Sequence, residues 1–133
     1  MISTIQEKIK VNIGIVPADR TAATVNGTGV SRLIDAKNEV LALLQIGAMG
    51  AAMTLDVKLQ ECATVGGTYT DIPSGAFPQK VTATDPNTIS ELFVNLDKTA
   101  RLEFIRAVGV VAGANAVAYS VALVFGKARV EPA

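Results

Sequence analysis

The residues of this chain with the chemistry for acid–base catalysis are carboxylates, because the sequence contains no histidine. Asp56 and Glu61 lie in one stretch that alternates apolar and polar residues, so a regular strand would point them to opposite sides. Two carboxylates on opposite sides cannot act on one substrate bond. Solvated surface charge explains the other acidic residues considered, which fall at turns or on polar faces: Asp71, Asp85, Asp97 and Glu103.

The chain also lacks the residues that nucleophilic catalysis and metal binding usually require. A Ser, Thr or Cys nucleophile usually needs a positioned base, most often His. With no His and a single Cys, the chain has neither an ordinary zinc set nor an internal disulfide. Asp85-Pro86-Asn87 is more typical of a turn than of a calcium loop. We therefore expect no catalytic residues, no metal and no cofactor, and Cys62 as a buried structural thiol near a strand end.

Charge and glycine patterns argue against phosphate-containing partners. The 12 basic and 12 acidic residues balance, and the Lys and Arg are scattered, so no basic patch for nucleic acid is predicted. Gly66-Gly67 and the glycines of residues 109–113 precede no predicted helix, so neither reads as a phosphate-binding loop. No nucleic-acid partner is expected.

The elements that must position these residues are β-strands. In residues 53–73 the apolar side chains Met53, Leu55, Val57 and Leu59 alternate with polar ones, a period of two that gives a strand one apolar and one polar face. Gly66-Gly67 then breaks the pattern, which resumes at Tyr69 and stops at Pro73. This predicts a β-hairpin.

Further short strands are predicted along the chain. Residues 40–46 form a continuous apolar run that fits a central strand or a short helix; its length and the glycines after it favour the strand. A long connection is predicted over 18–29, after Pro17 ends the first strand. The other predicted strands cover 9–15, 30–36, 79–84, 92–96, 101–111 and 116–125. Eight or nine such strands indicate an antiparallel sandwich or barrel.

Residues 107–126 carry no charge and are long enough to cross a bilayer. Gly113-Ala114-Asn115 interrupts this stretch as turn material, and residues 117–125 alternate as a strand does. We therefore predict two strands joined by a turn and no membrane partner. The aromatic residues Phe93, Phe104 and Phe125 lie in strand patterns that predict burial.

The stretch LQECATVGGTYTDIP, Leu59 to Pro73, resembles a segment of small structural proteins of tailed bacteriophages. The second half follows the same pattern: an alternating strand (92–96), a charged turn (97–99), an Arg-led strand (101–106), and a last strand before Gly126-Lys-Ala-Arg129. Together these segments are similar to capsid decoration, or cement, proteins, whose sandwiches are jelly-roll-like. The resemblance covers roughly residues 30–133 and implies an all-β, antiparallel, jelly-roll-like fold of about eight strands.

The resemblance implies a non-enzymatic virion protein, assembled in the bacterial host cytoplasm, on the outer capsid surface. Its expected partners are the major capsid protein and further copies of itself, with a dimer favoured over a trimer. The expected organisation is an N-terminal arm (1–8), one sandwich domain (9–126) and a C-terminal tail (127–133). The candidate capsid contacts are Ile5, Ile9, Val11, Arg129 and Val130, although Ile9 and Val11 could equally fill the domain's own core. The alternative function is a carbohydrate-binding or adhesin module, for which exposed aromatic residues are scarce.

Overall fold

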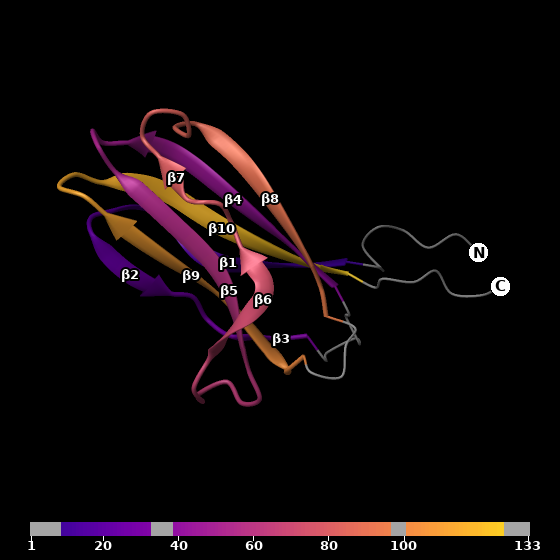
Figure 1. Ribbon diagram of the computed structural model, residues 1–133. Coiled ribbons are helices and arrows are strands. Elements are labelled where there is room, and N and C mark those ends of the chain that lie inside the picture. The colour runs from indigo at the N-terminus through magenta and orange to yellow at the C-terminus, as the bar shows by residue number, and fades with distance from the viewer. Residues whose placement is uncertain (1–8, 33–38, 97–100, 127–133) are drawn as a thin grey trace, which may run out of the picture.

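The structure, a computed structural model, describes residues 9–32, 39–96 and 101–126, which form two antiparallel sheets packed face to face (Figure 1). No helix occurs in these residues. The strands are β1 (Ile9–Arg20), β2 (Ala23–Asn26), β3 (Val30–Ser31), β4 (Glu39–Met49), β5 (Thr54–Cys62), β6 (Thr70–Ala76), β7 (Lys80–Val81), β8 (Thr88–Asn95), β9 (Phe104–Ala112) and β10 (Val117–Gly126). The predicted all-β antiparallel sandwich is confirmed.

The strand order identifies the sandwich as a jelly roll. The first sheet runs β1-β10-β4-β8, and the second runs β2-β9-β5-β6, with β3 also on β9 and β7 also on β5. When β2 with β3, and β6 with β7, are each counted as one strand, the sheets have the order of two interleaved Greek keys around one core. The strands on the outside of this order, β1 and β8 in the first sheet, form its edges.

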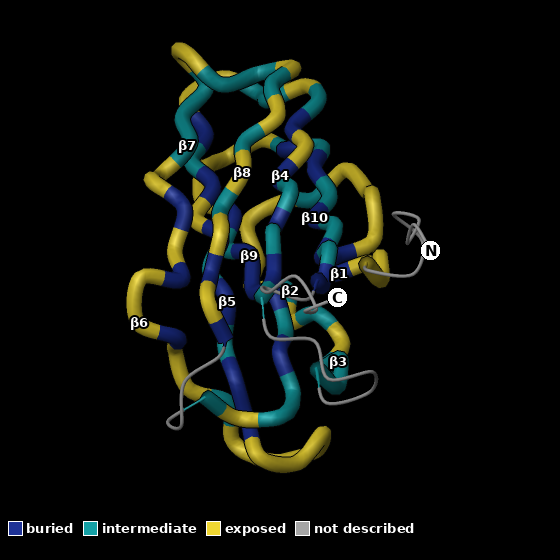
Figure 2. The backbone as a smooth tube through the Cα atoms, turned by 90° about the vertical axis from the view of Figure 1, so that its right-hand side faces the viewer, coloured by how far each residue is buried: buried dark blue, intermediate teal, exposed yellow. Residues whose placement is uncertain are grey.

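The core lies between the sheets and is built from the alternate residues of each strand. In β5, Leu55, Val57 and Leu59 are buried, while Asp56 between them is exposed (Figure 2). β10 follows the same period, with residues such as Val121 and Leu123 buried. The predicted amphipathic hairpin is confirmed: β5 pairs with β6, and its apolar side faces the core.

The structure corrects the predicted end of the first strand. β1 does not stop at Pro17 but continues to Arg20, and β2 occupies part of the predicted connection. Pro17 lies inside a register shift between Ile15 and Ala18 on an edge strand. A missing N–H is tolerated there, because the ladder is already interrupted and the outer side of the strand is unpaired.

Pro73 likewise does not end its strand. β6 runs on to Ala76, because it too is an edge strand and its ladder with β5 shifts register between Lys58 and Gln60. The strand predicted over 79–84 is only the two-residue β7. The predicted turn at Asp85-Pro86-Asn87 is confirmed: Asp85 Oδ2 accepts a hydrogen bond from the Val81 N–H at 2.7 Å, and Asn87 is left-handed at φ 59°.

The uncharged stretch 107–126 forms the end of β9 and all of β10, as predicted. The two strands belong to different sheets, so the turn between them carries the chain across the sandwich. Gly113 there has φ 125°, a conformation that favours glycine. The apolar run 40–46 lies in β4, the central strand predicted for it.

Candidate interaction surface

The outward side of the first sheet is apolar over most of its width. In β1, Val11 stands opposite Val124 of β10, which stands opposite Leu41 of β4, which in turn stands opposite Phe93 of β8. This gives one unbroken row of large apolar side chains across four strands. An antiparallel sheet whose outer side faces water usually carries polar residues at such positions.

The neighbouring rows extend this surface. Ile13, Ala122 and Leu43 stand in line beside the first row, and Ile89 of β8 lies one row further on. Residues on the edge strands are the most exposed, with Phe93 at 58% and Ile13 at 61%. We call this surface the apolar face; it consists of Val11, Ile13, Leu41, Leu43, Ile89, Phe93, Ala122 and Val124.

The apolar face is large enough for a weak contact with a partner. At about 4.8 Å between strands and about 3.3 Å per residue, the three rows across four strands cover roughly 400 Å², of which the eight residues of the apolar face occupy about two thirds. Exposed apolar patches of this size on soluble domains often mark interaction sites. The ionisable side chains within its rows and the row beside it are the carboxylates of Glu91 and Glu39.

The outward side of the second sheet is chemically different. Lys58 and Asp71 form an ion pair at 3.0 Å, and Gln60 donates to Asp71 at 2.8 Å. The Arg106 guanidinium donates to Gln60 at 2.7 Å and lies 4.1 Å from the centre of the Tyr69 ring. The hydrogen bonds to Asp71 lower the pKa of its carboxyl group below the usual value. The bond from Gln60 has the largest effect, and the bond from Lys58 has the next largest. The second sheet thus presents a polar, internally bonded surface.

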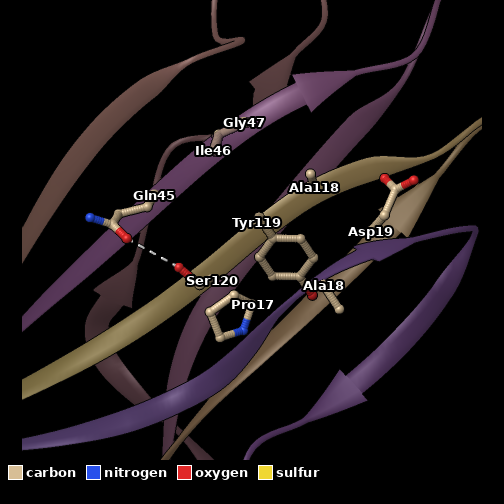
Figure 3. A pocket seen from close by; sticks show the side chains of 9 residues that line it. All are labelled: Pro17, Ala18, Asp19, Gln45, Ile46, Gly47, Ala118, Tyr119 and Ser120. Atoms are coloured by element: carbon tan, nitrogen blue, oxygen red, sulfur yellow. Dashed lines mark hydrogen bonds between the residues drawn. The ribbon is translucent and has the colours of Figure 1, made fainter.

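A shallow hollow of about 430 Å³ lies on the first sheet beyond the apolar face (Figure 3). It occurs where β1 shifts register between Ile15 and Ala18 and where β4 shifts register between Ile46 and Met49, so that Ala118 pairs regularly with Asp19 of β1 but has no regular partner on β4. Its polar groups are few: the Asp19 carboxylate, and Gln45 bonded to Ser120 at 3.3 Å.

The Tyr119 ring borders this hollow but points into the core, where it is 3% exposed. Its hydroxyl has no hydrogen-bond partner, and burial raises the pKa of that phenol. The Arg20 guanidinium lies 5.9 Å from the ring centre. The ring is therefore part of the packing beneath the hollow and offers no exposed stacking surface.

The two carboxylates considered for catalysis lie apart, on opposite sides of β5 as predicted. Asp56 faces solvent and accepts a hydrogen bond from Gln79 at 3.1 Å. Glu61 is 4% exposed and is paired with Arg101 at 3.2 Å, while the Leu102 N–H donates to it at 3.0 Å.

Cys62, at the end of β5, is buried as predicted. Within the described residues no three His, Cys, Asp or Glu side chains cluster as a metal site would require.

Of the predicted contact residues, Ile9 and Val11 lie on β1. Val11 is 58% exposed and belongs to the apolar face, and Ile9 is 36% exposed in the row beside it. The reading in which these two fill the domain's own core is wrong, because their side of β1 faces away from the second sheet. Ile5, Arg129 and Val130 lie outside the described residues, as do the predicted arm, the tail and the turn at residues 97–99.

Most of the apolar face was not predicted from the sequence. Phe93 was expected to be buried, and this is wrong: Val94 beside it is buried instead. The available signal was the run 40–46, in which both alternate sets of residues are apolar. The core of a sandwich needs only one apolar face from each strand. The second apolar face of this strand, with Leu41 and Leu43, therefore indicated a second contact surface.

Searches of protein-family models and of curated protein sequences find no match to this chain. No helix that could cross a membrane is found in the residues that the structure describes.

Proposed function

We propose that this chain is a non-enzymatic structural virion protein that binds the exterior of an icosahedral phage capsid. Bound copies would join neighbouring major capsid proteins and stabilise the shell against the pressure of packaged DNA. The observation that carries the proposal is the apolar face: a rigid sandwich exposes a row from Val11 to Phe93 that its own fold does not cover.

The sequence resemblance also supports this proposal. Residues 59–73 and the strands from residue 92 onward resemble capsid decoration proteins, whose sandwich type is the one found here. A patch of roughly 400 Å² is small for a stable interface, which generally needs about 800 Å² per partner. Binding to a symmetric shell compensates for this, because an oligomer engages several sites at once and gains avidity.

The proposal is tested with shells assembled from the major capsid protein encoded in the same genome. Purified protein is titrated onto expanded, undecorated shells, and bound copies are counted after co-sedimentation. We expect saturable occupancy at a fixed ratio to the capsid protein and a higher temperature of shell disruption. Absence of saturable binding would overturn the proposal.

The second candidate function is a carbohydrate-binding or adhesin module. It is favoured by the exposed Phe93 and by the hollow, which places Asp19, Gln45 and Ser120 on the same side of the sheet. A glycan array separates the two functions, because a sugar-binding module would retain specific glycans that compete with one another, whereas a shell-binding protein would not.

A further inference from the structure

The sandwich has four sheet edges, and three of them carry features that hinder pairing with another strand. β1 has two register shifts, and it contains Pro17 and Lys10. The edge formed by β2 and β3 consists of strands of four and two residues. The edge formed by β6 and β7 contains Pro73, a register shift and the left-handed Ser74. Bulges, prolines, lysines and short strands are the usual means by which proteins block their edges.

The fourth edge, β8, has none of these features, and its one charged residue is Glu91. Its eight residues pair with β4 in one continuous register from Thr88 to Asn95, without proline, glycine, lysine or arginine. Figures 1 and 2 show β8 along the outside of the first sheet, with exposed residues at every second position. A long edge strand in unbroken register and with apolar side chains readily adds another strand.

From this contrast we propose that β8 pairs antiparallel with β8 of a second copy, joining the two first sheets into one eight-stranded sheet. A two-fold axis perpendicular to the sheet makes this contact isologous, so each copy supplies the strand that the other needs. The inference rests on the homo-oligomer in the proposed function and names the edge that forms it.

Side-chain direction and charge select the register. The two-fold axis keeps each side of the sheet continuous, so residues of odd number must stand opposite residues of odd number. A register centred on Glu91 would place two carboxylates directly opposite, which is unfavourable. A register centred on Leu92 instead places Glu91 opposite Phe93 of the partner, and Leu92 opposite its own copy on the core side.

This pairing also changes the apolar face. Ile89 and Phe93, at 65% and 58% exposed, stand at the outer limit of the face in one copy. In the paired sheet they stand at its centre. Phe93 and its own copy lie diagonally across the seam and connect the two apolar faces, and each of them has a Glu91 carboxylate directly opposite. A dimer would then present about twice the area to a shell that each copy presents alone, roughly 800 Å².

The first test is sedimentation equilibrium of the full chain without capsids, from about 1 to about 500 µM, a range suited to a small interface. We expect a monomer–dimer equilibrium. Leu92→Lys puts two cations opposite each other at the centre of the contact and should weaken the dimer about tenfold or more. Asn12→Lys, an inward-pointing lysine on the opposite edge strand β1, is the matched control and should leave it unchanged.

The second test uses cysteine pairs and does not depend on the stability of Leu92→Lys. Single variants Ser90→Cys, Glu91→Cys, Leu92→Cys and Phe93→Cys are oxidised with diamide, and covalent dimers are measured. We expect Leu92→Cys to cross-link most, because residues directly opposite have the Cβ spacing of a disulfide. A chain that stays monomeric overturns both this pairing and the homo-oligomer. A trimer, a dimer insensitive to Leu92→Lys, or strongest cross-linking at another position overturns this pairing alone, and capsid binding is measured separately.

Discussion

Tyr119 carries a hydroxyl into the core, where it meets no hydrogen-bond partner. A Cβ atom added at Gly109 would lie 2.2 Å from this oxygen, so β9 and β10 approach closely there only because residue 109 is glycine. Burying an unpaired polar group costs about 1–3 kcal/mol. We expect Tyr119→Phe to raise the free energy of unfolding by about 1 kcal/mol, measured by urea denaturation.

Gly109→Ala is the complementary change. It should lower the free energy of unfolding by about 2 kcal/mol, because the new methyl group overpacks the core against the hydroxyl. Adding Tyr119→Phe should recover part of this loss. Additive effects in the double variant would contradict the contact between these two residues.

Asp71 provides a prediction for pH. Its lowered pKa means that the carboxylate stabilises the fold above the pKa of the unfolded chain, and that this contribution is lost as pH falls through the folded-state pKa. Replacing it by Asn should therefore reduce the unfolding midpoint in urea at neutral pH, and the difference from wild type should shrink as the pH falls through the lowered folded-state pKa. Asp56→Asn, on the same face, is the control. A difference for Asp71→Asn that does not change with pH would contradict the ionic origin.

At the scale of elements, the contact between β1 and the segment after β2 closes one side of the sandwich. The Gly27 N–H donates to the Ala107 carbonyl at 2.7 Å, and a Cβ at Gly27 would lie 2.0 Å from the Gly14 carbonyl oxygen. We expect Gly27→Ala to cost about 2 kcal/mol or more in thermal or urea unfolding, because backbone must move to admit it.

Gly66 supplies the matched control, because no atom lies within 4 Å of a Cβ built there. Gly66→Ala should be neutral or raise the stability slightly, by up to about 0.5 kcal/mol, through a less flexible unfolded chain. Equal losses in the two variants would show that the close crossing of β1 and the segment after β2 does not hold the sandwich together.

The strands show which parts of this fold a sequence pattern can predict. Alternation in β5 and β10 predicted both the strand and its buried side, because one set of residues is apolar. In β8 the alternation over residues 92–96 also marked the buried side, since Val94 and Leu96 are buried. Phe93 was nevertheless expected to be buried because it is apolar like its neighbours, and this was wrong, since it lies on the outer side of the sheet. The prediction that Pro17 and Pro73 end their strands was also wrong. Both prolines lie in edge strands beside register shifts, and these features depend on pairing between residues that are distant in the sequence.

At the scale of the whole molecule, the sandwich has one polar and one apolar outer side. The polar side is cross-linked by its own hydrogen bonds, from Lys58 to Arg106, whereas the apolar side is covered by none of the described residues. A surface of the second kind serves binding better than catalysis. The hairpin of β5 and β6, whose sequence carries the resemblance to cement proteins, lies in the other sheet, apart from the apolar face.

The measurement that tests this account most directly compares shell binding of three proteins: wild type, the double variant Val11→Glu with Phe93→Glu, and Val65→Glu. Val65 is 57% exposed, as Phe93 is 58%, but it lies between β5 and β6, away from the apolar face. Occupancy of undecorated shells is counted after co-sedimentation, with folding verified by urea denaturation. We predict that wild type and Val65→Glu saturate the shells equally and that the double variant, although folded, does not bind. Undiminished binding of the double variant would contradict the assignment of the apolar face as the capsid-binding surface.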